Sequence, residues 1–401
     1  MSSFFLVSLV GWVAVSLLAL LRSRFYAIYR AITLGLHVLF TAALVHRFEA
    51  LLPLYIYLHA TVFVQAVGLI RPRMRGRLYR ALISVPASFF AAGTLLSLPW
   101  VLLRIFGVDA PGVFVPYVAA AIGVMQSSWS REEARDIVVA DREKIPALSR
   151  LAPSAARVQR PLRVVQITDP HLGPFMSVQR LAGICQRAVD KQPDLIVLTG
   201  DFLTMESQHD PRLLEQALAP LAQLPGRVFA CFGNHDHEAP EIVRRALADN
   251  GITLLMDSAA LVETEAGPVQ LLGMDFVWRD RKQHLARVCA EHPRAPGHLR
   301  IVLLHDPGAF VHLPEGEADL VLSGHTHGGQ VGLVSLGLPY TMMRAFVKMP
   351  DHGLWARGTD RLYVHRGTGH YGFPLRLGVP SEEGVLNVHS LTHHGAGATA
   401  P

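Results

Sequence analysis

The sequence predicts an α-helical membrane bundle followed by an α/β domain, and three observations support this class. Long apolar segments without charge fill the N-terminal third. Beyond residue 160, short runs rich in Val, Ile and Leu alternate with amphipathic helical patterns, which is typical of α/β layers. Residues 1–130 carry ten Arg, no Lys and two acids, a net charge of +8, so the remainder carries −3 within a total of +5. We expect a transmembrane region at 1–129, a linker with a first strand at 130–160, the α/β domain at 161–391 and a disordered tail at 392–401.

Four or five segments are apolar enough to cross a bilayer, which takes about 20 residues in a helix. They are residues 4–21, 31–45, 51–70, 81–103 and 112–125. The last segment is doubtful, because it has fourteen residues and Pro111 and Pro116 lie near its start. A cleaved signal peptide would need a basic N-terminus before the first segment. No Lys or Arg precedes that segment, so we expect it to remain as a span.

The loops between these segments hold three, one, five and one Arg in chain order. Loops rich in Arg stay in the cytoplasm, which predicts a multi-pass protein of the cell inner membrane with its N-terminus outside. If residues 112–125 span the membrane, the α/β domain is cytoplasmic; if they do not, it faces the other side. The spans contain no acid and no Lys, and intramembrane charges are what mark a transport path. The bundle is therefore expected to serve as an anchor.

Six short apolar runs predict strands in the α/β region. They are residues 162–167, 194–198, 228–232, 269–272, 301–304 and 320–322. Helical patterns lie between them, for example at 178–191 and 240–250. A further apolar stretch at 137–140, inside the charged and Pro-rich linker, predicts the first strand of the domain. Runs of this kind are expected of strands that are buried on both faces.

Five of these strands end in residues of the types that bind metal ions. The motifs are Asp169-Pro170-His171, Gly200-Asp201, Gly233-Asn234-His235-Asp236, His305-Asp306 and Gly324-His325-Thr326-His327. The carboxyl ends of strands are where sites assemble in layered α/β folds. Two divalent cations about 4 Å apart clamp the attacking and leaving oxygens of a phosphate ester, which requires carboxylate, imidazole and amide ligands. A single motif of this kind is weak, but five in chain order, none containing Cys, indicate a dinuclear site for a hard or borderline metal.

The ordered pattern DxH…GD…GNHD…H…GHTH, carried by residues 162–391, resembles the calcineurin-like metallophosphoesterases. The extended GHTHGGQ at 324–330 and the preceding helices resemble the membrane-anchored branch of that family. The resemblance implies a two-sheet α/β sandwich flanked by helices. It also implies two sets of metal ligands that share one bridging carboxylate: Asp169, His171, Asp201 and His327 for the first metal, and Asp201, Asn234, His305 and His325 for the second.

The same resemblance assigns two catalytic residues and a reaction. His235 would contact the phosphate or protonate the leaving oxygen, and Asp236 would orient His235. The chain would be a metal-dependent phosphoric ester hydrolase that uses two divalent ions, whether Mn, Fe or Zn. It would cut a phosphodiester or pyrophosphate bond.

The membrane context suggests the substrate class. Because the bundle holds the domain at the bilayer surface, we expect membrane lipids as contacts and a lipid-linked phosphate as the substrate. UDP-2,3-diacylglucosamine is the first candidate, since some similar enzymes split its pyrophosphate in lipid A synthesis. The alternatives are a broad-specificity phosphodiesterase acting on soluble or other lipid esters, and a non-catalytic membrane scaffold that retains the fold. The net charge of −3 beyond residue 130 argues against nucleic acid as a partner.

Overall fold

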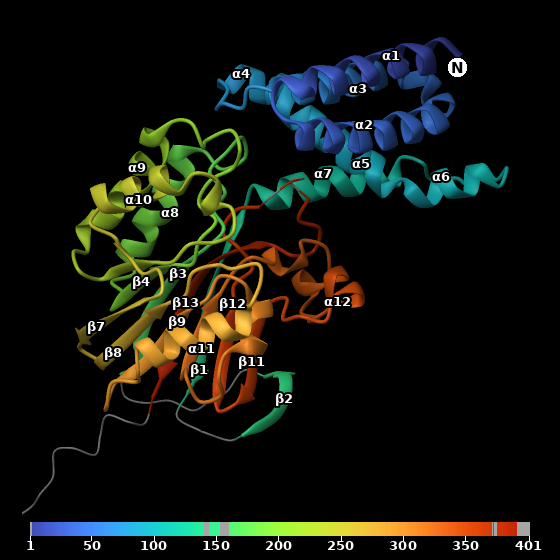
Figure 1. Cartoon of the computed structure of the whole chain (residues 1–401). Coiled ribbons are helices and arrows are strands. Elements are labelled where there is room, and N and C mark those ends of the chain that lie inside the picture. Colours follow the sequence, from blue (N-terminus) through green and yellow to red (C-terminus); the bar gives the residue numbers. More distant parts are fainter. Residues whose placement is uncertain (1, 140–143, 153–159, 371, 373–374, 391–401) are drawn as a thin grey trace, which may run out of the picture.

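The computed structural model joins a bundle of apolar helices to a two-sheet domain (Figure 1). It describes the chain except residues 1, 140–143, 153–159, 371, 373–374 and 391–401, so the tail expected at 392–401 lies outside the described residues. The bundle is formed by the helices before residue 128: α1 Ser2–Leu18, α2 Arg24–Leu44, α3 Leu52–Gly68, α4 Arg77–Tyr79, α5 Val85–Leu96, α6 Leu98–Ile105 and α7 Val115–Ser127.

Three helical segments of the described residues are long and apolar enough to cross a membrane: Ser3–Leu21, Arg24–Gly68 and Arg77–Leu96. The second contains two limbs, because non-helical backbone at Phe48 separates α2 from α3. The limbs run antiparallel, since the Tyr26 hydroxyl at the start of α2 donates to the Ala66 carbonyl near the end of α3 at 2.9 Å. The four predicted spans from 4 to 103 therefore correspond to helical passes, with the fourth interrupted at Ser97 between α5 and α6.

The doubtful fifth segment forms α7, which has 13 residues and a length of about 20 Å at 1.5 Å per residue. This is shorter than a hydrocarbon core of about 30 Å. The start of α5 and the end of α7 both lie at the α/β domain. Arg80, just before α5, donates to the Pro174 carbonyl at 3.3 Å, and Arg180 donates to the carbonyl of Ser127 in α7 at 3.2 Å. The helix α7 thus returns the chain to the end of the bundle where α5 began.

The region expected to be a linker is built into both sheets. The strand β1 Ser130–Val138 pairs in parallel with β13 along its whole length, and β2 Ile145–Arg150 pairs with β11. The first strand thus begins seven residues before the predicted 137, because five of the residues from 131 to 136 are charged and conceal the strand. The bundle and the domain are joined by β-structure, not by a free tether.

The α/β domain contains two sheets. The first has the order β1-β13-β3-β4-β5-β6 and the second β2-β11-β12-β10-β9-β8-β7. All six predicted strands are present, as β3 Leu162–Ile167, β4 Leu195–Leu198, β5 Val228–Ala230, β8 Gly267–Gly273, β9 Leu299–Leu303 and β10 Leu320–Ser323. The remaining strands are β6 Thr253–Leu254, β7 Ser258–Thr264, β11 Gly353–Gly358, β12 Asp360–Val364 and β13 Ser381–His389.

Side chains from both sheets meet in a shared core. Val164, Leu195 and Val197 of the first sheet pack with Ile301 and other residues of the second. The outer face of the first sheet is covered by α8 Val178–Asp190, α9 Pro211–Leu218 and α10 Pro240–Asp249, and α11 Arg281–Glu291 covers the second. The strand β4 has no exposed side chain, which explains why its sequence is continuously apolar and does not alternate. The predicted sandwich flanked by helices is confirmed.

Candidate metal centre

Five strand ends bring the predicted ligands to one edge of the sandwich. The strands β3, β4 and β5 run parallel in the first sheet, and β9 and β10 run parallel in the second. Each motif follows its strand by one to four residues, so the ligands meet where the strands end. Among the described residues, two groups can each hold an ion: Asp169 with His171 and His327, and Asp201 with His305 and His325.

Short distances place Asp201 between the two groups. One carboxylate oxygen of Asp201 lies 3.6 Å from Nε2 of His171 and 3.3 Å from Nε2 of His305. The same Nε2 atom of His171 lies 3.2 Å from Nε2 of His327. Asp201 therefore contacts both groups, as a bridging ligand must.

The backbone at this edge is held in conformations that side chains rarely adopt. Five of the predicted ligands have positive φ, at 50° for Asp169, 44° for His171, 58° for Asp201, 68° for His325 and 51° for His327. Each such residue costs on the order of 1–3 kcal/mol and persists only where the surroundings enforce it. A side chain at Gly233 would collide with the Asp201 carboxylate and the His305 ring. Glycine is therefore required there to let the two strand ends approach.

The ligand atoms of His305 and Asn234 are suited to binding a cation. Nδ1 of His305 lies 2.6 Å from the carbonyl oxygen of Thr199, which can only accept, so Nδ1 carries the proton and Nε2 presents its lone pair. Oδ1 of Asn234 is buried without a hydrogen-bond partner among the described residues. An unpaired amide oxygen on a loop of the same strand edge as these carboxylates and imidazoles fits a cation ligand better than an apolar contact.

Burial and neighbouring charge set the electrostatics of the site. Burial raises the pKa of Asp169 to about 6 and lowers the pKa of His171 to about 4. Burial also opposes charge on His305, but the Asp201 carboxylate outweighs it and raises the pKa of His305 to about 10. A proton and a cation thus compete for the same negative cluster, and cation binding must release the proton from His305.

The carboxylate of Asp236 is held by backbone groups around Asp201. Its buried carboxylate accepts backbone N–H groups from Asp201 at 2.7 Å, Gly233 at 2.7 Å and Phe202 at 2.8 Å. A carboxylate contact to the His235 ring comes from Glu238, whose Oε1 lies 2.7 Å from Nδ1. Asp236 therefore holds the backbone around Asp201, and Glu238 contacts the imidazole.

Glu238 was not predicted from the sequence, although it follows the GNHD motif at the end of a single 3₁₀ turn, Asp236–Glu238. Its contact raises the pKa of His235, against the opposing effect of burial. The ring of His235 lies 5.6 Å from that of His171, centroid to centroid, so it faces the cluster from its more open side. A protonated imidazole at this place can donate to a phosphoryl or leaving-group oxygen.

Arg376 is a second residue that sequence reasoning missed. Its fully buried guanidinium donates to the carbonyl oxygens of His327 at 3.2 Å and Arg366 at 2.8 Å, and also reaches Gly369. It thus fixes the loop that carries His327, while its backbone N–H donates to Ser127 of α7 at 3.2 Å. No local motif around residue 376 predicts this role, because the partners of Arg376 lie far away in the sequence.

Comparisons with known proteins agree with this geometry. The model of the calcineurin-like phosphoesterase family matches residues 162–329. The phosphodiesterase YaeI of Escherichia coli is 30% identical over 234 residues, which cover 57% of this chain and 82% of YaeI. The metallophosphoesterase YkoQ of Bacillus subtilis is 30% identical over 230 residues, covering 55% and 81%. A transmembrane protein with metallophosphoesterase domain from Danio rerio is 31% identical over 242 residues, covering 55% and 52%.

The chain therefore belongs to the calcineurin-like phosphoesterases, and it is a metal-dependent phosphoric ester hydrolase with a dinuclear divalent metal site.

Proposed function

We propose that this protein hydrolyses a phosphodiester or pyrophosphate bond of a lipid-linked substrate at the membrane surface, with UDP-2,3-diacylglucosamine as the first candidate. One observation carries the proposal: the bundle packs directly against the loop that follows the first metal motif. Arg80, just before α5, contacts Pro174, three residues after His171. The metal centre is thereby held beside the apolar helices, whereas a soluble substrate would require no such placement.

The proposed roles follow from the distances. Asp169, His171 and His327 would hold one cation, and His305 and His325 the other, with Asp201 bridging. Asn234, whose Oδ1 is buried and without a hydrogen-bond partner among the described residues, would complete the second set. Two divalent cations would supply Lewis acidity and lower the pKa of a bound water to about 7. His235, oriented by Glu238, would donate its proton to the leaving oxygen or bind the phosphoryl group. Asp236 would keep Asp201 in place through the backbone.

The position of Arg80 supports a cytoplasmic domain in an inner membrane. Arg80 belongs to the loop that carries five Arg, and it touches the catalytic domain. Arg22, in the other Arg-rich loop, donates to the Leu69 carbonyl at 2.8 Å, so both loops lie at that same end. Because Arg-rich loops stay in the cytoplasm, the domain would lie there too. Anionic headgroups at that surface attract each Arg by about 1 kcal/mol.

An exposed apolar segment on the domain also supports contact with the bilayer. It begins beside the bundle, where Val331 packs with Ala92 and Ala120. It continues through the short helix α12 Met342–Phe346, which Figure 1 shows on the bundle side of the domain. Its exposed apolar residues are Leu333, Leu336, Leu338, Tyr340, Met342, Phe346 and Val347. Such a patch next to membrane helices fits an interfacial position.

Two alternatives define the test. YaeI is named a phosphodiesterase, which favours phosphodiester chemistry and leaves a broad-specificity enzyme as the alternative within the class. A non-catalytic scaffold is disfavoured by the complete ligand set, since decay of activity usually removes a ligand.

The experiment compares a diacylated nucleotide sugar with its deacylated head group, in vesicles and in detergent, with purified protein and added Mn²⁺, Fe²⁺ or Zn²⁺. Faster cleavage of the acylated compound is expected. Equal cleavage of both compounds favours the broad enzyme, and cleavage of neither overturns the proposed substrate.

A further inference from the structure

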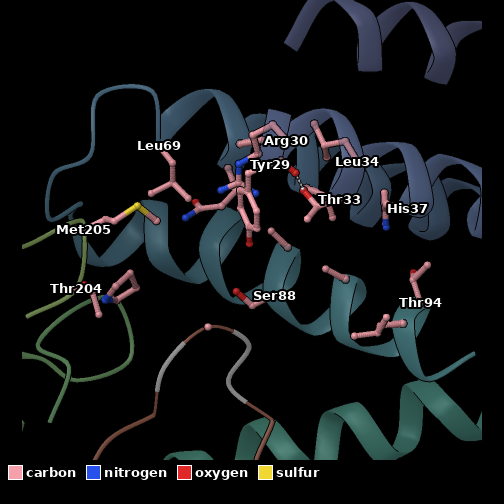
Figure 2. A pocket seen from close by; sticks show the side chains of 18 of the residues that line it. Tyr29, Arg30, Thr33, Leu34, His37, Leu69, Ser88, Thr94, Thr204 and Met205 are labelled. Atoms are coloured by element: carbon pink, nitrogen blue, oxygen red, sulfur yellow. Dashed lines mark hydrogen bonds between the residues drawn. The ribbon is translucent and has the colours of Figure 1, made fainter. Parts of the chain in front are cut away.

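A cavity of about 390 Å³ lies between the membrane helices and the catalytic domain, next to the metal centre (Figure 2). Its bundle side is formed by α2, α3 and α5. Its domain side is formed by loops around residues 171–175 and 204–206 and by His370 and Gly372, and His171, a predicted metal ligand, is part of the wall. The volume lies within the range of about 300–1,000 Å³ that holds a small-molecule ligand.

Helical periodicity explains why the space exists. On α5 the wall consists of Ala87, Ser88, Ala91, Thr94 and Leu95, which lie on one face of a helix. The first three of these side chains are small, so they leave a gap opposite α2. The gap is mostly lined by apolar atoms, and neither sheet of the domain reaches into it. An occupant must therefore be mainly hydrocarbon.

The length and exposure of the wall match one acyl chain. Along α2 the wall extends from Tyr29 to Phe40, roughly 16 Å at 1.5 Å per residue. One leaflet of hydrocarbon is about 15 Å thick. Leu36 and Leu95 in the wall are 46% and 49% exposed, so the cavity opens sideways toward the lipid. A tail can thus enter from the bilayer without crossing the protein.

Polar groups mark both ends of the cavity. Arg30 lies at the end near Leu69 and Met205, where the domain loops begin (Figure 2). Its Nε donates to the Tyr26 hydroxyl at 2.8 Å, and Glu206 lines the same end, so a phosphate there would be held by the remaining guanidinium N–H groups. Toward the other end, Nε2 of His37 is buried without a hydrogen-bond partner among the described residues. His37 is 6% exposed, and Figure 2 shows its ring extending from α2 toward α5. An unpaired imidazole inside apolar walls suits an occupant that carries an oxygen along its chain.

We propose that this cavity binds one acyl chain of the lipid-linked substrate and so sets the position of its phosphoryl group beside His171. The inference rests on the proposed lipid substrate and adds where its tail lies. Contacts with α2 and α5 would then determine the selectivity for the length and shape of the tail, whereas the metal centre would bind only the phosphoryl group.

Filling the cavity tests the proposal. Ala91→Phe places a ring in the gap, and Ala81→Phe is the matched control, because Ala81 is exposed before α5 and does not line the cavity. Each full-length variant is assayed on the diacylated nucleotide sugar in vesicles and on a small water-soluble phosphodiester. For Ala91→Phe we expect the rate on the lipid, divided by the rate on the soluble phosphodiester, to fall about tenfold. This is the effect of losing the burial of about two methylene groups of the acyl chain. For Ala81→Phe the ratio should equal that of the wild type.

A binding measurement covers the case in which Ala91→Phe fails to fold. Wild-type protein is irradiated with a diacyl phosphodiester that carries a diazirine at the end of one chain, and labelled peptides are mapped. Labels on α2 and α5 near His37 and Ala91 support the tail site, and labels only on the outer faces of the bundle overturn it. If the wild type prefers the lipid and both variants show the same rate ratio, the tail site is overturned, but the proposed lipid substrate is not. A wild type without that preference overturns the proposed substrate instead.

Discussion

Replacing Asp236 with Asn separates the role found in the structure from the one expected from the sequence. The carboxylate accepts three backbone N–H groups, two on Oδ2 and one on Oδ1. An Asn side chain keeps one acceptor oxygen and turns an NH₂ group toward at least one of these donors. Each buried N–H left without an acceptor costs about 1–3 kcal/mol, and the remaining bonds lose their charge assistance. We expect Asp236→Asn to lower the free energy of unfolding by about 2–4 kcal/mol.

The assay must detect stability and metal binding separately. For a domain of this size, 1 kcal/mol shifts the unfolding midpoint by about 2–4 °C, so a drop of roughly 5–15 °C is expected for the full chain in detergent with a chelator. Bound metal should also fall, because the Asp201 backbone is displaced. Glu238→Gln is the matched control, since it removes the carboxylate that touches His235 and leaves the three backbone bonds intact. An unchanged midpoint and full metal content in Asp236→Asn, with only the rate reduced, would refute this reasoning.

Three further predictions concern the catalytic groups and the membrane surface. Asp201→Asn should abolish activity and lower bound metal, because one residue contacts both groups; full turnover with both metals would exclude a bridge. His235→Ala should keep the metals and lose about a hundredfold in rate, whereas Glu238→Gln should lose only about fivefold, since their contact is partly exposed; loss of metal in either variant would contradict these roles. Phe346→Asp should slow cleavage of substrate in vesicles, with no such effect in Leu261→Asp, which also replaces an exposed apolar residue; equal effects would argue against an interfacial patch.

The metal centre was predictable because its information is local. Each ligand motif directly follows its own strand, and parallel strands place their ends together without any need to know the register. The same logic located β3, β4, β5, β9 and β10 to within two residues. Glu238 lay within reach of such reasoning, but its contact depends on one 3₁₀ turn that brings residues 235 and 238 to the same side.

Long-range contacts were not predictable from one sequence. Arg376 acts on His327 across 49 residues, through carbonyl groups that carry no signature in the sequence. The pairing of β1 with β13 joins residues about 250 positions apart, and its charged residues conceal the strand. Both features attach the domain to α7, so the contacts that join the bundle to the domain had no local signal in the sequence.

The bundle shows why a charge criterion alone does not describe a membrane region. The spans lack acids and Lys, which argued for an anchor, yet His37 and His59 stack inside the bundle with ring centroids 5.0 Å apart. A neutral imidazole costs far less in hydrocarbon than a fixed charge, so such residues escape that criterion. His59 is paired with the Ser8 hydroxyl at 3.0 Å, whereas His37 lines the cavity. The bundle can therefore lack a transport path and still offer His37 as a polar contact for a lipid tail. Binding a tail requires one oriented donor or acceptor, whereas transport requires a series of charged groups.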